Sequence, residues 1–210
     1  MSTRICIIRH GETDWNVEKR IQGQTDIPLN ETGRAQAMAM AFNAAHYNFT
    51  AVYSSDLSRA RATAQAVAEG RTLEIKTMAQ LRERHYGIFQ GITAVEAEKR
   101  YPEAHALYKA RDLNYDFETG ESLVSFAVRV MEAFGWIARH HSGHTVAVVC
   151  HAGVLDVIYR KATSRPLTTE RDFIIPNCAL NWFHFDGQGW HLDAWDDHHH
   201  LAKVLTESVE

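Results

Sequence analysis

The sequence predicts an α/β fold in which a mainly parallel sheet carries helices on both faces and ends in an antiparallel edge hairpin. Short apolar runs alternate with longer helical segments through most of the chain, which is typical of parallel strands joined by helices. The runs at 5–8 and 145–150 are apolar throughout, as expected for strands buried on both faces. Near the end, two strand-like segments flank residues 186–189 (DGQG), whose composition is typical of a hairpin turn.

Each element is assigned from a local pattern. The segments predicted to be strands are, in chain order, 4–9, 51–54, 73–76, 145–150, 179–185 and 190–193. The segments predicted to be helices are 32–46, 57–69, 93–100, 102–111, 122–140 and 154–161. Residues 112–120 are polar and irregular, which predicts a loop, and residues 201–205 continue a helical pattern.

Residues with capping preferences mark the ends of the first two helices. Asn30 or Thr32 is expected to cap the first helix, which is rich in alanine and methionine and has a high helix propensity. Ser55 or Asp56 is expected to cap the second helix. Gly70 ends that helix, because glycine readily adopts the left-handed conformation found after helices.

Composition is that of an ordinary globular protein, and it excludes several functions. Apolar residues make up 45% of the 210, and no repeat or linker divides them, so we expect a single domain over 1–210. The net charge is −4 and the basic residues are scattered, which argues against a nucleic-acid partner. No apolar stretch approaches the roughly 20 residues that cross a bilayer, so we expect no membrane contact. The first strand begins at once, so we expect no signal peptide and a cytoplasmic location. The cysteines Cys6, Cys150 and Cys178 are odd in number and lack paired spacing, and the first two lie in apolar runs, so we expect buried reduced thiols rather than disulfides.

Two of the predicted strands end in the same way, with a histidine followed closely by glycine. The first strand leads into RHG at 9–11, and the most apolar strand leads into CHAG at 150–153. Open α/β sheets place their ligand crevices at the carboxyl ends of strands. If both strands are central, His10 and His151 therefore face each other across one crevice. For the first motif alone, a solvated turn with a chance histidine is the alternative.

Arginine near these histidines indicates an anionic ligand. Arg59 lies in the first turn of its predicted helix, where a cation is unfavourable to the helix dipole and a bound anion would neutralise it. An ordinary exposed arginine is the alternative. Arg9, Arg59 and the two histidines together form a cationic group suited to phosphate. The sequence contains no GxxxxGK[ST] or GxGxxG pattern, which argues against a nucleotide-binding loop.

Two further clusters of polar residues have structural and functional interpretations. Glu83 lies between Arg82 and Arg84, a pattern that also suits a surface ion-pair cluster. The histidines at 198–200 follow two aspartates at 196–197, which leaves a metal site as an alternative to the favoured interpretation, a solvated junction.

The chain resembles the histidine phosphatase superfamily, the phosphoglycerate-mutase-like proteins. The motifs that carry the resemblance occur in order and cover most of the chain. They are RHGETDWN beginning at Arg9, IQGQTDIPLNETGRAQA at 21–37, YSSDLSRARATA at 53–64, LRERHYGIFQG at 81–91, TGES at 119–122 and CHAG at 150–153. The resemblance implies a three-layer α/β/α sandwich and a phosphohistidine mechanism without a metal or another cofactor.

The resemblance also implies roles for individual residues. His10 is expected to be the nucleophile, and it must be neutral, a state that the nearby arginines favour. Arg9, Arg59 and His151 are expected to hold the phosphoryl oxygens, with His151 protonated while phosphate is bound. Glu83 is expected to be the general acid, since a dianionic phosphate favours its protonated form. Further contacts to phosphate are expected from Thr13, Asn16, Gln22, Gly23 and Ala152.

Hydrolysis is expected rather than transfer between two positions of a substrate. The mutases of this family carry a long basic insertion after the motif that ends at Gly87. The corresponding segment here, residues 105–121, is shorter and has more acidic than basic residues. The expected substrate is a small phosphate ester, and a mutase or a non-catalytic binding protein is the alternative. Whether the chain forms a homodimer stays open. Candidates for the outer pocket are Ile21, Gln22, Tyr86, Phe89, Tyr108, Tyr115 and Phe117.

Overall fold

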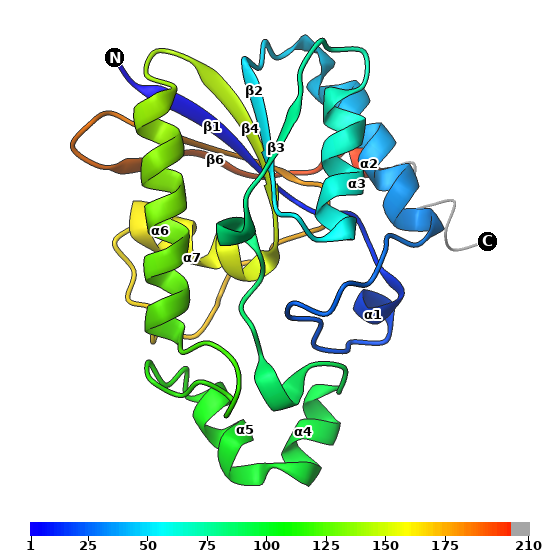
Figure 1. The fold of residues 1–210 in the computed structure, drawn as a ribbon, viewed down its shortest axis with the longest axis vertical. Coiled ribbons are helices and arrows are strands. Elements are labelled where there is room, and N and C mark those ends of the chain that lie inside the picture. Colours follow the sequence, from blue (N-terminus) through cyan, green and yellow to red (C-terminus); the bar gives the residue numbers. More distant parts are fainter. Residues whose placement is uncertain (203–210) are drawn as a thin grey trace.

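The computed structural model describes residues 1–202 and contains a six-stranded mixed sheet. Its strands are β1 (Thr3–Arg9), β2 (Ala51–Ser54), β3 (Ile75–Thr77), β4 (Thr145–Cys150), β5 (Leu180–Phe185) and β6 (Trp190–Asp197). The spatial order is β3-β2-β4-β1-β5-β6, in which the first four strands are parallel and the last two are antiparallel (Figure 1). The predicted parallel sheet and C-terminal edge hairpin are therefore confirmed.

The helices follow the predicted order with small shifts at their ends. They are α1 (Asp14–Val17), α2 (Glu31–Asn43), α3 (Ser58–Ala68), α4 (Ala94–Arg100), α5 (Pro102–Lys109), α6 (Leu123–His140) and α7 (Ala152–Ala162). Short 3₁₀ turns occur at Ala44–His46, Ala79–Leu81, Gly87–Phe89 and His199–Leu201. The one-turn helix α1 was not predicted. Of the helical pattern expected at 201–205, the part from residue 203 onward lies outside the described residues.

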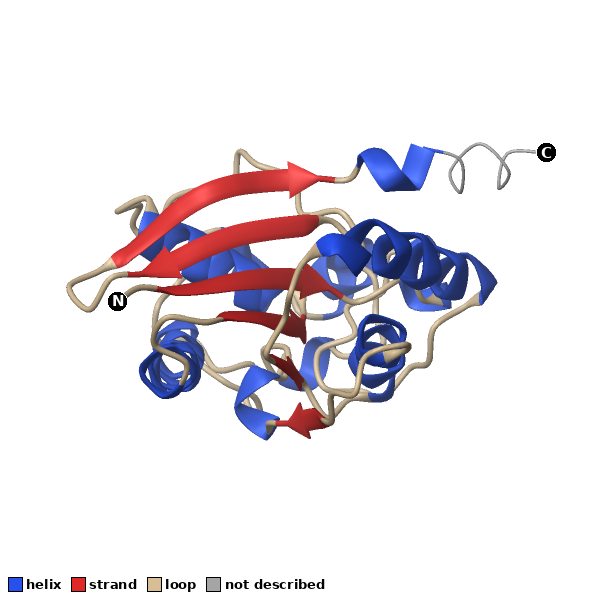
Figure 2. Cartoon of the chain, turned by 90° about the horizontal axis from the view of Figure 1, so that it is seen from above, coloured by secondary structure: helices blue, strands red, loops and turns tan. Residues whose placement is uncertain are grey.

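Helices cover both faces of the sheet, so the molecule has the three layers that the resemblance implied (Figure 2). Successive side chains of a strand point to opposite faces. Ile5 and Ile7 of β1 accordingly pack into the core beneath α6 and α7, whereas Cys6 and Ile8 pack into the core beneath α2 and α3. The two cores explain why the central strands are continuously apolar.

One expected helix cap is wrong. Leu57 is the N-cap of α3, and neither Ser55 nor Asp56 occupies that position. The acceptor for the first backbone N–H of the helix comes from elsewhere in the chain, because the Asp26 carboxylate accepts from the Ser58 N–H at 2.8 Å. The expected cap of α2 is confirmed at Asn30, whose side chain accepts from the Gly33 N–H.

A small lobe lies at the carboxyl ends of the parallel strands, at the bottom of Figure 1. It contains α4 and α5 and has its own apolar cluster, formed by Phe89, Ile92, Ala97 and Phe117. The lobe extends the molecule on the side where the two strand-exit histidines lie. No helix among the described residues has the length and apolar character needed to cross a membrane.

A buried ionic cluster ties α7 to the loops around it. Asp156 of α7 accepts hydrogen bonds from Arg160 and Arg171 at 3.1 Å and from Arg111 at 2.6 Å. Arg160 is itself buried and donates to the Pro166 carbonyl. Burial raises the pKa of Asp156, but Arg171 and Arg111 outweigh this effect and hold the pKa below its usual range.

Replacing Asp156 by alanine is expected to lower the free energy of unfolding by about 3–5 kcal/mol, because Arg160 would be left buried without a counterion. Since the folded pKa is depressed, this contribution is present at neutral pH and is lost only as the pH falls below about 4. Urea unfolding of the wild type and the variant at pH 7 measures the difference in their free energies of unfolding. The matched control is Asp172→Ala, which removes an exposed partner of Arg165 and should cost about 1 kcal/mol or less. Equal losses in the two variants would contradict the structural role assigned to Asp156.

Candidate active site

The two strand-exit histidines lie together at the centre of the sheet. Strands β1 and β4 are neighbours in parallel register, with Arg9 opposite Cys150, so the residues that follow them leave the sheet side by side. The rings of His10 and His151 are 5.1 Å apart between centroids. The predicted crevice between the histidines therefore forms because both strands are central.

Hydrogen bonds hold the backbone of His10 on both sides. Its N–H donates to the Cys150 carbonyl at 3.0 Å, and its carbonyl accepts from the Asn177 side chain at 2.7 Å. The next residue, Gly11, packs directly on α2. A Cβ atom at Gly11 would lie 2.4 Å from the Gly33 carbonyl oxygen, so only glycine fits at this contact.

The imidazole of His10 is held in one tautomer. Its Nδ1 lies 2.7 Å from the Gly11 carbonyl oxygen, which can only accept, so Nδ1 carries the proton and donates. The other nitrogen, Nε2, keeps its lone pair. Burial lowers the pKa of His10 well below its usual value, and the charges of Arg59 and Arg9 lower it further. The residue is therefore a neutral imidazole with a free nucleophilic nitrogen at neutral pH.

Arg9 and Arg59 are held by backbone carbonyl groups. Arg59 donates to the carbonyls of Thr25 and Gly23 at 2.8 and 2.7 Å, and Arg9 donates to the Ile175 carbonyl at 2.6 Å. In both side chains the buried Nε has no hydrogen-bond partner within residues 1–202. Burial lowers the pKa of each guanidinium group to about 10, so both stay charged at neutral pH. Buried charges with unused donors indicate that the site binds an anion.

His151 is the N-cap residue of α7 and is fully buried. Neither of its ring nitrogens has a hydrogen-bond partner in the described chain. Burial lowers its pKa well below the usual value, with further lowering by Arg59, His10 and Arg9. A buried imidazole with both nitrogens unused is a second indication that a polar ligand binds here.

The carboxylate of Glu83 sits on the first turn of α7. One of its oxygens accepts from the Gly153 N–H at 2.9 Å, and the other accepts from the Arg84 N–H at 2.8 Å. A Cβ atom at Gly153 would lie 2.1 Å from the carboxylate, so glycine is required for this approach. The carboxylate is therefore fixed in position by backbone donors.

The arginines on either side of Glu83 bind other partners. Arg82 forms a two-pronged ion pair with Asp56, with hydrogen bonds of 2.7 and 2.6 Å. Arg84 donates to the carbonyls of Glu121 and Tyr115. The surface ion-pair interpretation therefore holds for Arg82, whereas Glu83 itself is almost fully buried and belongs to the site.

A cavity of about 160 Å³ brings most of the predicted site residues together. Its walls are formed by Arg9, His10, Asn16, Arg20, Ile21, Gln22, Gly23, Arg59, Glu83, Tyr86, Tyr108 and Ala152. His151 lies behind this wall, against the ring of His10. Thr13 does not line the cavity. It is the N-cap of α1, where its hydroxyl donates to the side-chain oxygen of Asn16 and accepts from the Asn16 backbone N–H.

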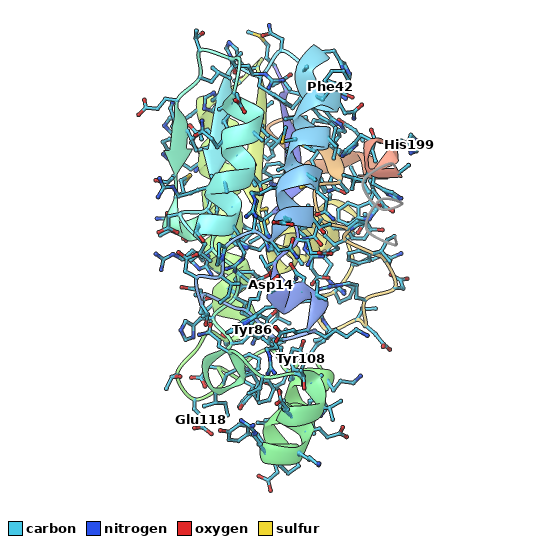
Figure 3. The ribbon with its side chains drawn as sticks, turned by 90° about the vertical axis from the view of Figure 1, so that its right-hand side faces the viewer. Asp14, Phe42, Tyr86, Tyr108, Glu118 and His199 are labelled. Carbon is cyan, nitrogen blue, oxygen red and sulfur yellow. The ribbon has the colours of Figure 1, made fainter. Side chains whose placement is uncertain are left out.

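The candidates for the outer pocket divide into two groups. Ile21, Gln22, Tyr86 and Tyr108 line the cavity, whereas Phe89 and Phe117 are fully buried in the core of the lobe. Tyr115 packs against that core and does not line the cavity. Figure 3 shows Tyr86 and Tyr108 near each other, between the main body and the lobe.

Several residues that support the site were not predicted to do so, although Gln24 and Thr63 lie within motifs that carry the family resemblance. Asn177 binds the His10 carbonyl from a segment 167 residues away, and Thr63 accepts from the Gly11 N–H. Gln24 donates to the Glu83 carbonyl. Each acts through a long-range backbone contact, which no local pattern reveals.

The C-terminal histidines are occupied by other contacts. His198 bonds to Asp196, and His200 bonds to the Cys178 carbonyl. Within residues 1–202 there is no group of three His, Cys, Asp or Glu side chains that could hold a metal ion.

Comparison with known proteins identifies the family. The sequence model of the histidine phosphatase superfamily (branch 1) matches residues 5–198. The chain is 40% identical over 204 residues to phosphoglycerate mutase-like protein 4 of Arabidopsis thaliana, an alignment covering 95% of this chain and 87% of that protein. It is 38% identical over 205 residues to the metal-independent phosphoserine phosphatase of the same plant, covering 96% and 84%.

A solved structure supports the same conclusion. The phosphoserine phosphatase of Entamoeba histolytica in complex with 3-phosphoglyceric acid superimposes with a TM-score of 0.85 at 27% identity, covering 95% of this chain and 99% of that one. The resemblance inferred from the motifs is thereby confirmed: the chain belongs to the histidine phosphatase superfamily.

Proposed function

We propose that this protein is a phosphomonoesterase that hydrolyses small phosphate esters through a phosphohistidine at His10. The observation that carries the proposal is the state of His10. Its imidazole is neutral, its Nδ1–H is fixed on the Gly11 carbonyl, and it shares a cavity with two buried guanidinium groups. A free Nε2 beside a phosphate site is what nucleophilic attack on phosphorus requires.

The reaction has two steps. In the first, Nε2 of His10 forms a bond to phosphorus while the ester P–O bond breaks, and Glu83 gives its proton to the leaving alkoxide. In the second, Glu83 takes a proton from water, the resulting hydroxide attacks phosphorus, and the P–N bond breaks to release phosphate. Glu83 returns to its protonated form, so protons balance over the cycle. Glu83 lines the same cavity as His10, as both roles require.

Arg9, Arg59 and His151 would stabilise the phosphoryl group during both steps. The carbonyl groups that hold the arginines leave the buried Nε–H groups free to donate to phosphoryl oxygens. A dianionic phosphate would counteract the charges that lower the pKa of His151 and so allow its protonation. Asn16, Gln22, Gly23 and Ala152 line the cavity and would add hydrogen bonds, and Thr13 would act by positioning Asn16.

Hydrolysis is favoured over phosphoryl transfer to a second substrate position. The acidic residues of the segment 105–121 cap their own loop, since Asp112 accepts from the Asn114 and Tyr115 N–H groups and Asp116 accepts from the Glu118 N–H. The cations of the segment, Lys109 and Arg111, line the adjoining cavity rather than the cavity at His10. The cavity at His10 therefore has no basic cover from this segment, and water can reach the phosphohistidine. Because one relative is named a phosphoserine phosphatase and a matched structure holds 3-phosphoglyceric acid, these two phosphate esters are the first substrates to test.

His10→Ala is expected to lower kcat roughly a thousandfold or more, because the covalent route is lost. Labelled wild-type enzyme quenched during turnover should carry an acid-labile phosphate at His10, and a chelator should leave its activity intact. His46→Ala is the matched control, since His46 is exposed and far from the site. Turnover without an adduct at His10, or activity abolished by the chelator, would argue against the proposal.

Glu83→Gln is expected to lower kcat/KM for alkyl phosphates about 100-fold or more, because no proton reaches the leaving alkoxide. Hydrolysis of p-nitrophenyl phosphate should fall much less, since its leaving group departs without a proton. Steady-state rates on both esters measure the difference. The control is Glu118→Gln in an exposed loop. Equal losses on both esters would assign Glu83 to binding rather than proton transfer.

The two active-site histidines are expected to protonate last when the pH falls. Hydrogen bonds that the His198 ring donates to Asp196 raise the pKa of His198, whereas burial lowers the pKa of both His10 and His151 well below 6.5. Phosphorylation of His10 should therefore survive acidification from pH 7.5 to about pH 6. An NMR titration of the histidine ring signals gives the order of protonation directly. If His10 becomes protonated at a higher pH than His198, the assignment is refuted.

A further inference from the structure

A second cavity adjoins the proposed phosphate site. Its volume is about 260 Å³, and Tyr86 and Tyr108 line both cavities. The two rings pack edge to face with their centroids 6.1 Å apart, and they form the boundary between the cavities. On the other side of the boundary, Ala152 lines the first cavity and its neighbour Gly153 lines the second. A group attached to a bound phosphate ester would enter this second space.

The lining of the second cavity is cationic. It contains four cationic side chains against two acidic ones. One of the acids, Asp156, is already bonded to three arginines and is buried, so its charge is neutralised within the protein. The remaining acid is Glu170, on the same loop as Arg171.

Two of the cationic side chains have donors to spare. Arg171 uses Nε to bind Asp156, and its two terminal nitrogens make no hydrogen bond within the described chain. Lys109 at the end of α5 is exposed and makes no hydrogen bond or ion pair with residues 1–202. Arg111 and Arg84, in contrast, bind carbonyls or Asp156 with their guanidinium groups.

Arg171 is close enough to affect the first cavity electrostatically. Its charge contributes to the lowered pKa of Arg9, and it lowers the pKa of Tyr86 and Tyr108, although burial raises both tyrosines overall. Arg171 thus lines the second cavity, and its charge also acts on residues of the first. Because Asp156 is held by α7, the ion pair with Asp156 fixes the base of the Arg171 guanidinium group.

We propose that this second cavity binds a carboxylate of the leaving group, with Arg171 as its principal ligand, Lys109 as a second cation and Asp156 as a positioning residue. The proposal rests on the proposed function, and it makes phosphorylated carboxylic acids the preferred substrate class. A planar guanidinium group presents two parallel N–H donors to the two oxygens of a carboxylate. The Tyr86 and Tyr108 rings would contact the short carbon chain between the two anionic groups.

The test compares matched substrates that differ in the carboxylate. One pair is 3-phosphoglycerate and glycerol 3-phosphate, and the other is phosphoserine and phosphoethanolamine. Wild-type enzyme should prefer the carboxylate member of each pair about tenfold or more in kcat/KM. Arg171→Ala should raise KM for the carboxylate members about tenfold or more, while kcat/KM for the partners that lack the carboxylate changes less than about threefold.

The matched control is Arg165→Ala. Arg165 lies on the same loop, its side chain is 38% exposed like that of Arg171, and it pairs with Asp172 away from the cavity. This variant should leave all four substrates unaffected. Lys109→Ala, at the exposed end of α5, should lower the carboxylate preference about threefold and tests the proposal even if Arg171→Ala is unstable.

Each result decides between the two proposals. Loss of the carboxylate preference in Arg171→Ala supports the second subsite. If the wild type hydrolyses p-nitrophenyl phosphate through His10 but treats both members of each pair alike, the subsite is refuted and the proposed function stands. If Arg171→Ala lowers kcat/KM equally for all substrates, Arg171 acts on the first cavity only, which also refutes the subsite. If no phosphate ester is hydrolysed, both proposals fail.

Discussion

The arrangement of this molecule depends on burying two guanidinium groups beside a neutral imidazole. Arg9 and Arg59 are bound by backbone carbonyls, so most of their positive charge is not cancelled by carboxylates. That charge and the surrounding burial keep His10 unprotonated, while the same charge attracts a phosphate dianion. In the proposed reaction, one electrostatic feature would thus prepare the nucleophile and bind the group that it attacks.

The scaffold holds this charge in place through backbone contacts. The register of β1 with β4 sets the distance between His10 and His151, and the contact between Gly11 and Gly33 fixes the loop that carries His10 on α2. Asn177 holds the same loop from the other side. Because these contacts use carbonyls, N–H groups and glycines, the loop has little freedom to move away from the crevice.

Two carboxylates at helix α7 have different partners: Glu83 binds the first turn of the helix from outside, and Asp156 belongs to the helix. Glu83 is held at the cavity by the N–H groups of Gly153 and Arg84, and its carboxylate forms no ion pair with an arginine among residues 1–202. Asp156, one turn further along, is saturated by arginines and links α7 to the loops at Arg111 and Arg171. Glu83 is the proton donor of the proposed reaction, and Asp156 links the elements around the adjoining cavity.

The sequence by itself determined the α/β architecture and the central histidines. Short continuous apolar runs that alternate with helical segments indicate strands buried on both faces, and a residue that follows such a strand lies at the carboxyl edge of the sheet, so His10 and His151 were predictable from local pattern. Local pattern did not predict the partners of Arg82 and Arg84 or the hydrogen bond from Asn177 to the loop of His10. It also did not predict that Asp26 accepts from the first N–H of α3 or that Thr13 caps α1. Tertiary structure alone decided these, because each depends on which distant backbone group or charge the fold brings within hydrogen-bonding distance. The tautomer of His10 was decided in the same way, by the position of one carbonyl oxygen in the folded loop.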